Sequence, residues 1–86
     1  MARRNTAFLR ASYVENLLAP RNVAETMAQV ELWFAVRDAE LRHWPDGRAP
    51  ASGSTVPVSL DGLSPDARRM AGRIGRHMAG YRKAWD

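Results

Sequence analysis

Residues 22–44 form the longest stretch of this sequence without a helix breaker, and they place apolar side chains on two opposite faces of one helix. At about 100° per residue, the larger side chains share one face: Val23, Met27, Val30, Trp33, Phe34, Leu41 and Trp44. The opposite face carries smaller ones: Ala28, Leu32, Ala35, Val36 and Ala39. A helix that is apolar on two sides is usually packed on both. The fold must therefore cover two faces of a helix that is roughly 33 Å long.

Two arrangements would cover both faces. Helices before and after this segment could pack against one side each, which makes it the central core helix of a three-helix domain. Alternatively, one side is covered by a second copy of the chain or by another protein. In that case the face of Ala28, Leu32 and Val36 is the candidate interaction surface. The flanking helices, of thirteen and some twenty residues, need not cover both faces over the whole length of the central one, so the second arrangement stays open.

Local signals mark both ends of this helix. Asn22 is a favourable N-cap residue, and Glu25 lies three positions later, where its side chain can reach back to the Asn22 amide. The sequence Pro45-Asp46-Gly47 ends the pattern. We therefore expect a helix over residues 22–44.

A first helix is expected over residues 6–18. Leu9, Tyr13 and Leu17 recur every four residues, and Pro20 stops the pattern soon afterwards. The Pro/Gly-rich residues 45–63 read as a crossover loop. Within it, residues 55–60 alternate as in a strand, but Pro57 argues against one. We expect an extended segment laid across the helices through Val56, Val58 and Leu60.

The third expected helix, over residues 64–84, has a clear start. Ser64 is the N-cap, Pro65 takes the first helical position and Asp66 places an acid in the first turn. Beside its apolar stripe runs a row of small residues, which allows a neighbouring backbone to approach closely: Ala67, Ala71, Gly75 and Ala79.

These elements predict an all-α fold, a single helical domain over residues 1–86 with a long central helix. The length suits one domain. The chain has no cysteine, so disulfides and thiolate metal sites are excluded. The N-terminus has no uninterrupted apolar core, so it does not read as a signal peptide. No segment approaches the roughly 18 apolar residues of a membrane span. We expect a cytoplasmic protein without membrane contact.

Arg37 lies in the middle of the large apolar face, where a charge needs a partner or a route to water. The favoured interpretation is that its stem packs and its head reaches solvent. Alternatives are stacking on Trp33, Phe34 or Trp44, or a pair with a carboxylate such as Glu15. Arginine is also enriched in binding hot spots, so Arg37 is a candidate contact residue.

Charge is distributed unevenly along the chain. The formal net charge is +4, and it divides into +3 for residues 1–21, −3 for residues 22–61 and +4 for residues 62–86. Arg69, Arg73 and Arg76 share one face of the C-terminal helix with Lys83. Together with Arg3 and Arg4 they form a candidate surface for phosphates. A solvated helix face, or contact with an acidic protein, would explain the same pattern.

Catalytic signals are missing from the sequence. His43 and His77 lie in different predicted helices, and neither has a carboxylate or a metal-ligand motif at the required spacing. The glycines do not form a phosphate-binding loop. We therefore expect no enzyme, no metal, no cofactor and no small-molecule substrate. A pocket that holds either histidine beside a carboxylate would revive an enzymatic interpretation.

The function expected from these features is that of a small non-enzymatic regulator, inhibitor or accessory subunit. It would dock on a protein partner, as a homodimer or hetero-complex, through Ala28, Leu32, Val36, Arg37, Arg69, Arg73 and Arg76. Small basic helical proteins of this type are common in phages and mobile elements. The alternative is a nucleic-acid-binding protein that uses Arg3, Arg4, Arg69, Arg73, Arg76 and Lys83, mainly through phosphate contacts.

Overall fold

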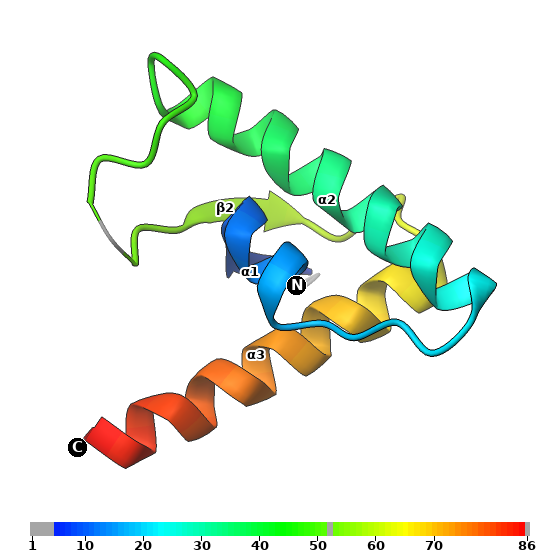
Figure 1. Cartoon of the computed structure of the whole chain (residues 1–86). Helices are drawn as coiled ribbons and strands as arrows, with labels where there is room; N and C mark the ends of the chain where they lie inside the picture. The colour runs from blue at the N-terminus through cyan, green and yellow to red at the C-terminus, as the bar shows by residue number, and fades with distance from the viewer. Residues whose placement is uncertain (1–4, 52, 86) are drawn as a thin grey trace, which may run out of the picture.

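Three helices and a two-stranded sheet make up the part of the chain that the computed structural model describes, residues 5–51 and 53–85, with side chains as far as Met78. The elements follow in the order β1 (Thr6–Leu9), α1 (Ala11–Asn16), α2 (Val23–His43), β2 (Val56–Ser59) and α3 (Pro65–Trp85). Helices α2 and α3 diverge from one corner of the molecule, and α1 and the sheet lie in the angle between them (Figure 1). The expected three helices with a long central one are confirmed.

The expectation of a purely helical fold is wrong, because the first part of the predicted helix over 6–18 is a strand. Strand β1 pairs with β2 in antiparallel register: Thr6 with Ser59, Ala7 with Val58, Phe8 with Pro57 and Leu9 with Val56. The backbone remains extended at Arg10, with φ −144° and ψ 154°, and turns helical only at Ala11. Residues 6–9 thus gain backbone partners some fifty positions away, which a local helical pattern does not reveal.

The segment around Pro57 is extended as expected, and it is also hydrogen-bonded as a strand. Val56, Val58 and Leu60 are buried, so the predicted anchors are confirmed. Proline is tolerated because each strand of a two-stranded sheet has a free edge, where a missing N–H leaves no neighbouring carbonyl without a donor.

Helix α2 begins where the sequence indicates. The Asn22 side chain accepts a hydrogen bond from the Glu25 amide at 2.9 Å, which confirms the N-cap. The reciprocal bond is shifted by one residue, because the Glu25 carboxylate accepts from the amide of Arg21, at 2.9 Å, and not from that of Asn22. At the other end, Trp44 is extended and buried, so the chain turns inward there.

Helix α3 starts as predicted and packs its small residues inward. The Ser64 hydroxyl accepts from the Ala67 amide at 3.1 Å. Ala67 and Ala71 are buried together with Met70 and Ile74. Gly75 is exposed, and the Ala79 side chain lies outside the described part, so the close approach involves only the first half of the small-residue row.

The core lies between α2, α3, α1 and the inner face of the sheet. Its largest fully buried side chains are Leu9, Leu32, Met70, Ile74, Val14, Val36 and Val56. None of the helices within the described ranges is long and apolar enough to cross a membrane.

Candidate functional site

The two apolar faces of α2 have different environments. The small-residue face points inward: Ala28, Leu32, Val36 and Ala39 are between 0% and 8% exposed. The face predicted as an interaction surface is therefore part of the core, and the prediction that Ala28, Leu32 and Val36 contact a partner is wrong. Small side chains suit this position because α3 presents Ala67 and Ala71 to the core, so helices can approach closely.

The large-residue face of α2 points outward, and apart from the buried Trp44 and the partly buried Trp33 its apolar side chains are exposed. We call its exposed members the outer stripe. They are Val23 (76% exposed), Met27 (68%), Val30 (50%), Phe34 (63%) and Leu41 (56%). They follow one another at intervals of four, three, four and seven residues. Arg37 divides the last interval, because it lies three residues after Phe34 and four before Leu41. The stripe is thus continuous along almost the whole helix.

Arg37 is held at the edge of the stripe by two acceptors. Its Nη1 atom donates to Glu40 Oε1 at 2.9 Å and to the carbonyl oxygen of Gly47 at 2.6 Å. Its side chain is 35% exposed, which agrees with the packed stem and solvent-edge head favoured by the sequence. Arg37 thus pairs with a carboxylate, as one alternative proposed, but the partner is Glu40, whereas Glu15 accepts from Trp33.

The loop after α2 is closely fitted to these side chains. Gly47 has a φ of +69°, and a Cβ atom there would lie 2.7 Å from Leu41 Cδ2 and 3.0 Å from the Arg37 guanidinium. Glycine is therefore required at this position both for its backbone conformation and for space. The C-terminal end of the outer stripe is thereby fixed in place.

Trp33 forms one flank of the outer stripe. Its ring lies edge to face with that of Phe34, with centroids 5.3 Å apart and an interplanar angle of 89°. Its indole Nε1 donates to Glu15 Oε1 at 2.8 Å, which links α2 to α1. Because both ends of the indole are fixed, this flank presents a rigid aromatic surface.

Two acidic residues, Glu31 and Asp38, form the opposite flank. Glu31 accepts hydrogen bonds from both the hydroxyl (2.7 Å) and the amide (2.8 Å) of Ser64, and these bonds hold the pKa of its carboxyl below the ordinary value of 4.5. Asp38 forms an exposed ion pair with Arg42. Both carboxylates are therefore engaged within the chain, one of them with the start of α3.

The predicted basic face of α3 is partly neutralised. A cleft of about 610 Å³ is lined by Asn5, Pro65, Arg68, Arg69, Gly72, Arg73 and Arg76. Arg69 pairs with Asp66, and Arg73 lies 3.7 Å from a Glu25 oxygen. Arg3 and Arg4 lie outside the described residues, as does the Lys83 side chain. The structure thus brings Arg69, Arg73 and Arg76 together and adds Arg68.

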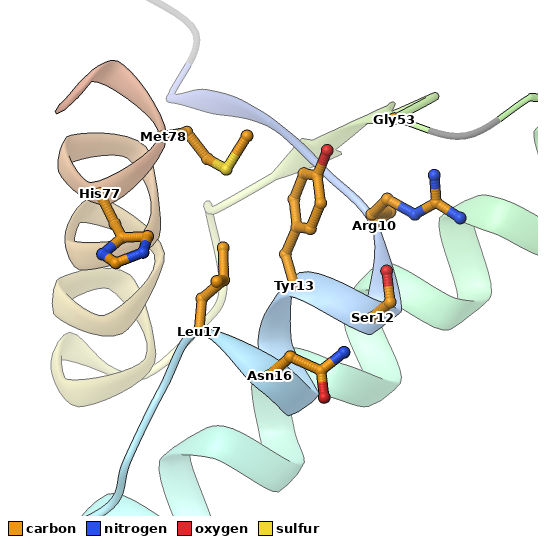
Figure 2. Close-up of a pocket in the computed structure, with 8 residues that line it drawn as sticks. All are labelled: Arg10, Ser12, Tyr13, Asn16, Leu17, Gly53, His77 and Met78. Carbon is orange, nitrogen blue, oxygen red and sulfur yellow. The ribbon is translucent and has the colours of Figure 1, made fainter. Parts of the chain in front are cut away.

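His77 lines a pocket of about 520 Å³ between α1 and α3 (Figure 2). The Tyr13 ring rises between Leu17 and Arg10 in this view, and the Arg10 guanidinium lies 5.8 Å from the ring centroid. The lining residues within the described chain include one imidazole and one phenol but no carboxylate. The pairing of His77 with an acid that acid–base catalysis would need is not formed there.

His43 lines a cleft of about 390 Å³ between α2 and β2, which Asp38 and Asp61 also line. Its Nδ1 atom is 2.9 Å from the Ala39 carbonyl oxygen, four residues earlier, and Asp38 is paired with Arg42. The cleft therefore holds His43 beside carboxylates, as the enzymatic interpretation requires, but the described residues form no ion pair between His43 and either aspartate. They also contain no cluster of three or more His, Cys, Asp or Glu side chains that could hold a metal ion.

No family model, curated protein or solved structure matches the chain.

Proposed function

We propose that this chain is a non-enzymatic protein-binding protein that docks through the outer stripe of α2. The observation that supports the proposal is the exposure of five large apolar side chains in one continuous row. Single exposed apolar residues are common on soluble proteins, but a contiguous apolar surface of several hundred Å² marks an interaction site. This surface replaces the inner face of α2 as the site of the expected protein contact.

The energetics favour an occupant that is apolar itself. Side chains of this size expose on the order of 200 Å² each when free, so the stripe offers on the order of 600 Å². Its burial contributes on the order of 15 kcal/mol. Association costs about 4–15 kcal/mol in lost freedom, so a stable complex also needs burial of apolar surface on the partner.

The spacing of the stripe favours a helical occupant. Alternating intervals of three and four residues are the pattern by which one helix packs along another. The rigid Trp33 and the ring of Phe34 add aromatic surface at the centre, where binding hot spots concentrate. A regulator, inhibitor or accessory subunit that docks by helix-to-helix contact agrees with this geometry.

Two matched variants test the proposal. Phe34→Ser removes the centre of the stripe, whereas Phe8→Ser removes a phenylalanine of similar exposure (68%) on the outer side of the sheet. In size exclusion of a lysate of its native cells, the tagged natural protein should elute at an apparent mass well above that of one tagged chain, which is 9.6 kDa plus the tag. Phe34→Ser should elute as free chain, and Phe8→Ser should elute with the natural protein. Elution of the natural protein as free chain, or equal loss in both variants, would overturn the proposal.

Nucleic-acid binding through α3 is the second candidate function, supported by the four arginines that line one cleft. Phosphate contacts make affinity fall steeply with salt. The variant Arg73→Glu with Arg76→Glu should abolish binding of a labelled DNA duplex while Phe34→Ser leaves it unchanged. No salt-dependent binding by the natural protein would eliminate this candidate.

A further inference from the structure

We infer that the occupant of the outer stripe is the same stripe of a second copy of this chain, in antiparallel orientation. The inference rests on the proposed function and specifies the partner. It follows from the spacing of the residues along the stripe, from the position of the charged residue Arg37 and from the apolar area that the stripe exposes.

The outer stripe is complementary to itself when two α2 helices run in opposite directions. If the twofold axis crosses the stripe at the level of position 32 along the helix, Val30 lies opposite Phe34 of the second copy, Met27 opposite its Arg37 and Val23 opposite its Leu41. Heptad positions a and d alternate along a helix seam. Each of these layers pairs an a position of one copy with a d position of the other, as antiparallel pairing requires. The smaller Val30 meets the larger Phe34, so the central layers fill without a clash between two rings.

Arg37 decides between the two possible directions. In a parallel pair every residue lies opposite its own equivalent, so two guanidinium groups would meet inside an apolar seam. Antiparallel pairing separates the Arg37 positions by ten residues along the axis, or about 15 Å. At about 15 Å the repulsion between two unit charges is roughly a quarter of its value at 4 Å. Each Arg37 is also already paired with Glu40 of its own chain.

The flanks agree with this arrangement. Trp33 comes close to Trp33 of the second copy near the axis, and its fixed ring extends the apolar contact there. On the other flank the two Glu31 residues approach one another. Both oxygens of each carboxylate accept hydrogen bonds from Ser64, which turns the charge toward α3 and away from the seam.

The area also meets the requirement of a stable dimer. The stripe offers on the order of 600 Å² per copy, hence on the order of 1,200 Å² for the pair before the flanks are included. Specific interfaces bury about 1,200–2,000 Å² in total. No surface beyond α2 and its flanks is needed.

Engineered cysteines test the direction of pairing, and the absence of native cysteine makes their disulfides unambiguous. Under mild oxidation of the purified protein, Val23→Cys alone and Leu41→Cys alone should stay uncross-linked. The double variant, or a mixture of the two single variants, should convert largely to a covalent dimer. Phe8→Cys, exposed but off the stripe, is the control for random collision and should give no dimer.

Each other result has a definite meaning. Self-cross-linking of either single variant would show parallel pairing and overturn the inference. Absence of cross-linking in the double variant, together with sedimentation of the natural protein at the mass of one chain, would also overturn it. In that case a complex in lysate that Phe34→Ser abolishes would support the proposed function with a foreign partner. Absence of such a complex would overturn the proposed function as well as this inference.

Discussion

The carboxylate of Glu40, buried to 4% exposure on α2, accepts a hydrogen bond from the backbone amide of Ala11 at 2.7 Å, across 29 positions of sequence. Its second oxygen accepts from Arg37 at 2.9 Å. Ala11 is the first residue of α1, and the Arg10 side chain forms no cap there. Glu40 therefore supplies from another element the acceptor that the start of α1 lacks.

Removal of this carboxylate should destabilise the fold. Glu40→Ala leaves the Ala11 amide without an acceptor and Arg37 without its ion-pair partner, so the free energy of unfolding should fall by about 2–4 kcal/mol. Glu40→Gln retains one acceptor oxygen and should cost less, about 1 kcal/mol. Urea denaturation of the three proteins measures the difference. Equal stability of Glu40→Ala and the natural protein would contradict the assigned contacts.

The opposite roles of the two faces of α2 predict opposite effects of similar truncations. Leu32 is fully buried and Phe34 is 63% exposed. Leu32→Ala should lower the free energy of unfolding by about 2–5 kcal/mol because it leaves a cavity. Phe34→Ala should change the stability of the single chain by less than about 0.5 kcal/mol. Thermal denaturation at low protein concentration checks both, and a large loss in Phe34→Ala alone would mean that the faces are assigned the wrong way round.

The contact between Glu31 and Ser64 should make stability depend on pH. Because hydrogen bonds from Ser64 hold the pKa of the Glu31 carboxyl below 4.5 in the folded chain, folding favours the ionised form. The stabilisation is therefore present above about pH 4.5 and is lost as the pH falls through the folded-state pKa. In Glu31→Gln this contribution disappears, so its stability deficit against the natural protein should shrink as the pH falls. Urea denaturation between about pH 3 and pH 6 measures it.

Asp46→Asn, a change to an exposed carboxylate in the turn after α2, is the control for the general effect of charge removal. A deficit in Glu31→Gln that stays constant with pH would show that the hydrogen bonds from Ser64 do not favour the ionised form.

The N-cap of α2 gives a further prediction. The Asn22 side chain satisfies the Glu25 amide, so Asn22→Ala should lower the free energy of unfolding by about 0.5–2 kcal/mol. Asn22→Gly should cost only a few tenths of a kcal/mol, since glycine also suits a cap position. Chemical denaturation of both variants makes the comparison, and equal losses would contradict a capping role.

Local signals determined which parts of the fold could be predicted from sequence. The start of α2 at Asn22, the start of α3 at Ser64 and the stop after Trp44 are encoded by neighbouring residues, and all three were predictable. Strand β1 was not, because its partner Val56–Ser59 lies far along the chain and its own four residues fit a helical pattern equally well.

The orientation of α2 could not be predicted for a different reason. Both faces are apolar, and Arg37 on the face of Phe34 did not decide between them, because its stem could pack while its head reached solvent. The choice depends on what packs beneath, and small α3 residues such as Ala67 suit the small-residue face. Glu40 was missed because its role depends on Ala11, which belongs to a helix start that the sequence did not indicate.

The most direct test of the outer stripe as a protein contact is a photo-cross-linking phenylalanine analogue, placed at position 34 or, as control, at position 8. Both positions carry an exposed ring, so neither change should disturb the fold. Position 34 should give a defined protein adduct in native cells, with the mass of a second copy, and position 8 should give none. Absence of an adduct at position 34, or the same adducts at both positions, would contradict this role of the outer stripe.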